Sequence, residues 1–316
     1  MQHAPRQREA ARRSDDTIPV QTKNGTQTMV ISSFWDTLLG KTGKRPTMGA
    51  MLLQSAHVRA WSQSHDVVRL EHLVSALVDL TDVERALEAR GMQPADVQAV
   101  LDQLIEGLPR RAEDAADIEP TFDKALDALV VSARLNGVLS SAPFIENIAN
   151  ALPPELGFVR RPLAASATEL GATFDAPIAF AANGGLTFEG WDDDLQKCMG
   201  LMQVLSDTRW EAWHLGTIQL FVALLSYKPY HAKFKARGVD PNAVIREIGE
   251  HLPKTRLPTR DRPAGFKPSV GPGLFAVILR AERYAAADAS DVRLRHLLQA
   301  LHEEPHLKAS IDMLVA

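Results

Sequence analysis

Residues 68–77 read VRLEHLVSAL, and residues 292–301 read VRLRHLLQAL. Two further stretches are similar to the last eight residues of these two, so that the chain carries four related copies of one octet. In each copy the first, fourth, fifth and eighth positions are mostly apolar, and this spacing places them along one side of a helix. The sequence therefore predicts four amphipathic helices, each needing another element to cover its apolar side. The octets are LEHLVSAL (70–77), IENIANAL (145–152), TIQLFVAL (217–224) and LRHLLQAL (294–301).

A second helix is predicted before each octet. Residues 51–64 place Leu53, Ala56 and Ala60 on one face, and residues 126–133 show similar apolar spacing. Small alanines allow two helix backbones to approach closely. Each repeat is therefore expected to be a pair of packed helices.

A shared turn motif follows the first and third octets. The motif ARGMQP (89–94) recurs as ARGVDP (236–241), 147 positions later, and the octets themselves are separated by the same distance. Glycine adopts the left-handed conformation that ends a helix, and proline suits the first turn of the next helix. The agreement indicates that the first two repeats were duplicated together, which gives two domains of two repeats each.

The composition fits a helical globular protein. The chain has 316 residues, of which 45% are hydrophobic, 23% are charged and only 6% are aromatic. The single cysteine, Cys198, excludes a disulfide framework and a multi-cysteine metal site, and we expect it to be a buried thiol. We find neither a secretory signal nor an apolar run long enough to span a bilayer. These features predict a cytoplasmic protein with no cofactor and no membrane contact.

Charge and composition divide the chain into four segments. A basic leader (1–47) is expected to be disordered, and a segment rich in proline, glycine and alanine (154–191) is expected to be a partly ordered linker. The first predicted domain (48–153) has eight basic and sixteen acidic residues, whereas the second (192–316) is nearly neutral. An acidic first domain favours basic peptides and makes nucleic acid an improbable partner.

The repeat resembles that of the N-terminal domain of Clp-type AAA+ unfoldases. In that family two repeats form one small helical domain, with the pattern Thr-Glu-His-Leu-Leu where this chain has Glu-His-Leu at 71–73. The resemblance covers residues 48–152 and 192–316. It implies an all-α protein of two tandem Clp N-domain-like bundles, each a pseudo-twofold pair of helical repeats. The second octet runs into Pro153 and Pro154, so that the first domain is either trimmed or completed by the linker.

The ATPase modules of that family are missing from the sequence. The nearest match to a phosphate-binding loop, GKT at 40–42, has Trp35 where the first glycine belongs. The resemblance therefore implies a protein or peptide-binding module without catalytic activity. Such a module would be an adaptor, decoy or regulator of Clp-dependent protein quality control, and its partners would be a Clp unfoldase or its substrates.

Glu71 and Glu146 are the candidate binding residues. Each takes the second position of its octet, where the helix dipole favours a carboxylate. The resemblance implies that this pair receives the guanidinium of phosphoarginine-tagged substrates, and carboxylates do pair with guanidinium groups through two hydrogen bonds. The equivalent residues of the second half are Ile218 and Arg295, which cannot provide the same acidic contact.

Two alternative functions remain open. Residues 302–306 read HEEPH, which formally matches the zinc-hydrolase motif H-E-x-x-H with His302, Glu303 and His306. Pro305 is expected to break the helix that this chemistry requires, which favours a loop after the fourth octet. The basic segment 254–267 would instead suit nucleic-acid binding, with strong salt dependence.

Overall fold

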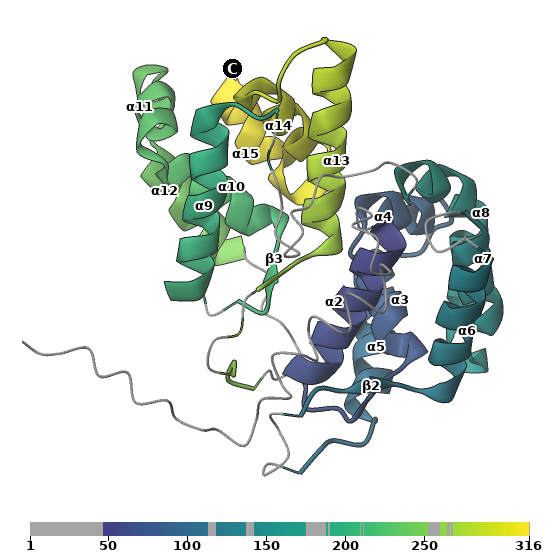
Figure 1. The fold of residues 1–316 in the computed structure, drawn as a ribbon. Helices are drawn as coiled ribbons and strands as arrows, with labels where there is room; N and C mark the ends of the chain where they lie inside the picture. Colours follow the sequence, from purple (N-terminus) through teal and green to yellow (C-terminus); the bar gives the residue numbers. More distant parts are fainter. Residues whose placement is uncertain are drawn as a thin grey trace, which may run out of the picture. The chain divides into compact units, whose positions relative to one another are not determined.

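The computed structural model describes residues 47–112, 118–136, 142–174, 188, 190–208, 210, 212–251, 260–263, 266 and 268–315. Except for Thr47, the predicted leader lies outside these residues. Residues 43–316 belong to one compact unit. Its described part is mostly helical, with four strands of two residues each, which confirms the predicted all-α class (Figure 1).

The first half of this unit is arranged around α2. The hydroxyl oxygen of Thr47 accepts a hydrogen bond from the backbone N–H of Ala50 at 3.3 Å and so caps the start of the helix. Thirteen of the fifteen residues of α2 are buried, because helices pack on several of its sides. The elements are α2 (Met48–Ser62), β1 (Val67–Val68), α3 (Leu70–Val78), α4 (Thr81–Glu88), α5 (Pro94–Glu106), β2 (Thr121–Phe122), α6 (Lys124–Leu135), α7 (Ala142–Ala151), the 3-10 turn η2 (Pro154–Leu156) and α8 (Gly157–Phe174).

The second half repeats this order of elements. A short parallel strand pair joins β1 to β2 through Val67 and Thr121, and an equivalent pair joins β3 to β4 through His214 and Ser269. Each pair fixes the start of one octet helix beside the start of the next repeat. The elements are α9 (Asp193–Thr208), β3 (His214–Leu215), α10 (Thr217–Ser226), α11 (Lys228–Ala236), α12 (Pro241–His251), β4 (Ser269–Val270), α13 (Pro272–Ala287), α14 (Leu294–His302) and α15 (Pro305–Val315).

The four octets form helices with buried apolar sides, as predicted. Helices α3, α10 and α14 begin at the first residue of their octets, and α7 begins three residues earlier, at Ala142. The fourth, fifth and eighth octet positions are buried in all four copies: Leu73, Val74, Leu77, Ile148, Ala149, Leu152, Leu220, Phe221, Leu224, Leu297, Leu298 and Leu301.

The repeated turn motif has the predicted geometry. Gly91 has φ +73° and Gly238 has φ +82°, the left-handed conformation that an L side chain rarely adopts. Pro94 and Pro241 then open α5 and α12. The motif therefore ends one helix and starts the next in both halves.

The linker expected over residues 154–191 is helical in its first part. Helix α8 packs on α7 and on α4, and it buries Leu156, Val159 and Leu163 together with the preceding turn. These apolar residues complete the core of the first half, which therefore extends beyond the boundary predicted at residue 153. The linker thus supplies the tail that the second repeat lacked.

Aromatic residues join α2 to the segment around β3 and β4. The rings of Trp61 and Trp213 meet edge to face with centroids 5.8 Å apart, and Val58 and Phe266 complete the cluster. The guanidinium of Arg260 lies over both indoles, 5.4 Å and 5.5 Å from their centroids. Trp61 and Trp213 are therefore part of the core.

Candidate functional site

In three of the four octets, the side chain at the third position caps the start of the octet helix. His72 Nδ1 accepts a hydrogen bond from the backbone N–H of Arg69 at 3.0 Å. His296 does the same for Arg293 at 3.1 Å, and Gln219 for Gly216 at 3.0 Å. Each side chain satisfies a backbone donor that the helix itself cannot pair. The histidine of the Glu-His-Leu motif is therefore a structural cap, a role that the sequence analysis missed.

The predicted binding residue Glu71 lies in the first turn of α3, as expected. Its side chain is half-buried, and no described residue forms an ion pair with it. The carboxylate at this position faces the positive end of the helix dipole. Glu71 is thus placed to accept a cationic group.

The expected placement of Glu146 in the first turn of its helix is wrong. Pro143 allows α7 to start at Ala142, because proline suits the first turn, and Glu146 is consequently the fifth helical residue. Its side chain is exposed. Helix α3 packs mainly on α2 and α5, whereas α7 packs mainly on α8, so that the two glutamates stand on helices without extensive mutual contact.

The second half presents different chemistry at the equivalent positions. Ile218 is half-buried on α10. Arg295 on α14 is exposed, and its Nη2 lies 2.7 Å from Oδ2 of Asp288. An apolar side chain therefore occupies the place that Glu71 has in the first half, and a cationic side chain occupies the place of Glu146.

The HEEPH sequence does not lie on one helix. His302 ends α14 and Pro305 begins α15, so that the predicted helix break is confirmed. His302 Nε2 lies 2.7 Å from Asp312 Oδ1, and His306 Nε2 lies 3.0 Å from Thr217 Oγ1. The two histidines thus contact different partners instead of facing a common point.

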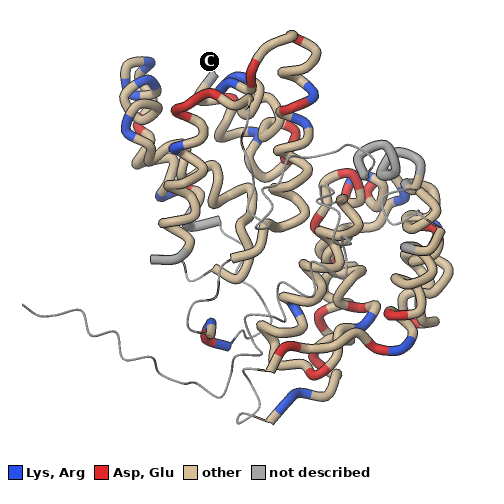
Figure 2. The backbone as a smooth tube through the Cα atoms, viewed as in Figure 1, with Lys and Arg blue, Asp and Glu red and all other residues tan. Residues whose placement is uncertain are grey.

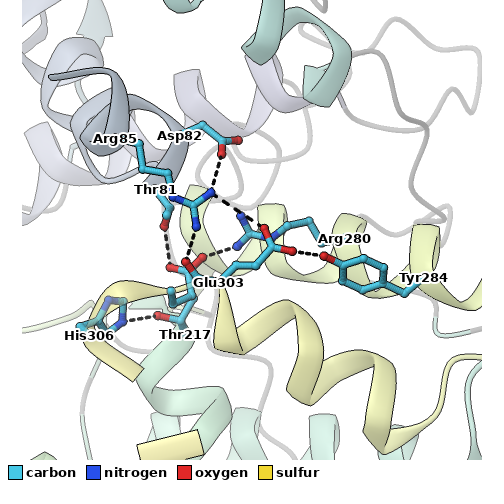
Figure 3. Close-up of polar contacts among 9 residues, drawn as sticks. Thr81, Asp82, Arg85, Thr217, Arg280, Tyr284, Glu303 and His306 are labelled. Carbon is cyan, nitrogen blue, oxygen red and sulfur yellow. Dashed lines mark hydrogen bonds and ion pairs between the residues drawn. The ribbon is translucent and has the colours of Figure 1, made fainter. Parts of the chain in front are cut away.

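Glu303 and Glu304, the two glutamates of HEEPH, form polar contacts with α4 and α13 (Figure 3). Thr81 donates a hydrogen bond to Glu304 at 2.9 Å, and Arg280 forms an ion pair with the same carboxylate. Arg85 donates to the backbone carbonyl of Glu303 at 2.7 Å. Tyr284 donates to the Glu303 side chain. The residues that would serve a zinc hydrolase are therefore engaged in structural contacts.

The pKa of Glu84, on α4, is affected by the nearby Glu304. Burial, and then the negative charge of Glu304, raise the pKa of Glu84 to about 7. Both effects disfavour the ionised carboxylate. Glu84 consequently adds an unfavourable charge to this region at neutral pH and above.

Three buried histidines of the first half are held neutral. His65 Nδ1 lies 2.9 Å from His72 Nε2, and His57 Nε2 lies 3.0 Å from the carbonyl oxygen of Pro120. Burial lowers the pKa of His57 and of His65 to about 4, and that of His72 to about 3. Because His72 Nδ1 accepts from Arg69, its Nε2 carries the proton and donates to His65.

Other candidate reactive groups are buried or paired. Cys198 is buried, as expected, and burial raises the pKa of its thiol to about 12. Arg260 and Arg262 belong to the basic segment 254–267, and both contact the protein itself. The lysines of that segment lie outside the described residues. Within the described ranges, no three His, Cys, Asp or Glu side chains are arranged to hold a metal ion.

A groove that the sequence analysis missed lies between α11, α14 and α15. Its volume is about 460 Å³. The available signal in the sequence was α11 itself, KPYHAKFKA, which carries three lysines and no acidic residue. The lining residues are Lys233, Phe234, Arg237, Leu294, Arg295, Leu298, Gln299, His302 and Ile311.

Comparison with known protein families finds one match, in the first half of the described unit. Residues 49–138 match the family model of the Clp repeat (R) N-terminal domain. The match includes α2, the His72 cap and Glu71, and it ends before α7 and Glu146. No curated protein and no solved structure matches the chain. No described helix is both long enough and apolar enough to cross a membrane.

Proposed function

We propose that the chain consists of two tandem Clp N-domain-like bundles. The family match over residues 49–138 supports the first bundle. The second is supported by the return of the same element order over 193–315, with an equivalent parallel strand pair and an equivalent left-handed glycine at Gly238. Each bundle would be a pseudo-twofold pair of helical repeats.

These bundles would act as a protein or peptide-binding module without catalytic activity. The observation that carries this proposal is the Clp repeat itself, in which Glu71 is half-buried in the first turn of a capped helix. Glu71 and Glu146 would receive arginine or phosphoarginine side chains of clients. The whole chain would act in the cytoplasm as an adaptor, decoy or regulator of Clp-dependent protein quality control.

The binding part of the proposal is tested with purified protein and labelled peptides. We expect fluorescence anisotropy to show binding of a phosphoarginine peptide, and we expect E71A/E146A to weaken it at least about tenfold, because each lost carboxylate removes a charge-assisted contact. The matched control is E106A/D127A, which removes two exposed acids of the same half and leaves affinity unchanged. Equal affinity for both double variants would disprove the assigned site.

The adaptor part of the proposal needs a separate measurement. The chain, immobilised and exposed to lysate, should retain a Clp-type unfoldase or its arginine-phosphorylated clients in amounts that E71A/E146A reduces. Recovery of neither class by the wild-type chain would remove the assignment to Clp-dependent quality control.

A further inference from the structure

The groove of the second half combines an apolar floor with a cationic rim. Its floor is formed by Phe234 from α11, by Leu294 and Leu298 from α14, and by Ile311 from α15. A volume of about 460 Å³ lies within the range of roughly 300–1,000 Å³ in which proteins hold small ligands and side chains. The groove is therefore large enough for a few apolar side chains of a partner.

Four basic side chains line the same groove. Arg295 pairs with Asp288, and His302 lies beside Asp312, so that these two already have acidic neighbours. Lys233 instead lies over the ring of Tyr230, with 5.2 Å from Nζ to the centroid. Neither Lys233 nor Arg237 forms an ion pair with any residue that the structure describes.

The basic character of the groove is specific to the second half. Helix α11 is the counterpart of α4 at the same offset of 147 residues, and α4 carries Asp82, Glu84 and Glu88. At the equivalent positions α11 has proline, histidine and lysine. Arg295 on α14 likewise takes the octet position that Glu146 has on α7. Figure 2 shows the basic residues along α11.

A difference in helix packing between the two halves explains why the groove beside α11 is open. In the first half α8, with 18 residues, packs on both α7 and α4. Its counterpart α15 packs mainly on α14. Helix α11 packs on α10 and α12. Helix α15 therefore covers α11 less than α8 covers α4, and the groove lies between α11, α14 and α15.

We propose that this groove binds an acidic amphipathic helical segment of a partner protein, distinct from the basic clients assigned to Glu71 and Glu146. The segment would cover α11 as α8 covers α4 in the first half. Its apolar side chains would contact Phe234 and Leu298, and its carboxylates would pair with Lys233 and Arg237. Charge complementarity selects an acidic segment, because Lys233 and Arg237, which have no acidic partner among the described residues, lie beside the apolar floor.

The probe is a fluorescein-labelled peptide with leucines at helical positions i, i+3 and i+4 and with glutamates at the remaining positions. We expect it to bind the full chain, and we expect K233E/R237E to weaken binding at least about tenfold. K228E/K235E is the matched control, because it makes the same charge change at exposed positions of α11 outside the groove. Its affinity should equal that of the wild type.

Further comparisons decide between this proposal and its alternatives. A version of the peptide with glutamine in place of glutamate should bind at least about tenfold more weakly, and added salt should weaken binding of the acidic version. Equal affinity of the two peptides, retained binding by K233E/R237E, or no binding by the wild type would each overturn the proposal. Sedimentation that shows self-association through the groove would assign it to a second copy instead.

This test is independent of the proposed function. Binding of the acidic peptide is measured with no Clp unfoldase present, and E71A/E146A should leave it unchanged. Failure at the groove therefore leaves the assignment of Glu71 and Glu146 intact, and failure of those residues leaves the groove intact.

Discussion

Substitution of Arg280 by methionine should strongly destabilise the protein. The Arg280 side chain is 11% exposed, and Glu304, with which it pairs, is 3% exposed. Removing one member of a buried ion pair leaves the other charge without compensation, which costs about 3–5 kcal/mol. After the substitution, the Glu304 carboxylate would retain the hydrogen bond from Thr81, and the negative charge of Glu303 would lie nearby.

The double variant R280M/E304Q provides the decisive comparison. Because glutamine carries no charge and can still accept the hydrogen bond from Thr81, we expect the double variant to recover most of the loss. The free energy of unfolding is measured by urea denaturation at fixed pH, followed by tryptophan fluorescence from the Trp61 and Trp213 cluster. Non-additivity of at least about 1.5 kcal/mol is expected for residues in direct contact. If the two single costs simply add, the ion pair is not the buried interaction described above.

Three further predictions concern other parts of the fold. Below pH 6.5 the unfolded chain protonates its histidines, whereas His72 stays neutral down to about pH 3, so that acid favours unfolding by about 1.4 kcal/mol per pH unit for this group. H72Q keeps a side-chain cap, as Gln219 does, and should show a shallower loss of stability between pH 6.5 and 4 in denaturant titrations; an unchanged slope would contradict the assignment. G238A should lower stability by about 1 kcal/mol in urea titrations, because alanine is strained at φ +82° although the space around it is open, and an unchanged midpoint would argue against a left-handed residue there. Cys198 should resist a thiol reagent in the native state and react on unfolding, since burial raises its pKa to about 12; rapid native labelling would show that the thiol is exposed.

The sequence predicted the helices well because each is encoded locally. The buried octet positions and the glycine and proline at 238 and 241 follow helical periodicity and turn chemistry over a few residues. Helix α8 escaped prediction because its alanine, threonine and proline content conceals the buried Val159 and Leu163. Its packing depends on α7 and also on α4, and α4 lies far from α8 in the sequence.

The site was predicted less completely than the fold. Glu71 lies where the octet pattern placed it, but the pattern could not reveal that Pro143 moves the start of α7 and shifts Glu146 away from the first turn. The groove depends on side chains from three helices, so no single stretch of sequence contains it. Only the basic composition of α11 was available as a signal, and a charged helix usually forms an ordinary solvated surface.

The side-chain cap at the third octet position also affects which residues the second octet position can accept during evolution. Since His72, Gln219 and His296 satisfy the start of their helices, residue two contributes little that folding requires. Glutamate, isoleucine and arginine all occur there in capped copies. A gene duplication that inherits this arrangement can acquire a new ligand preference by single mutations, with no need for compensating changes in the core.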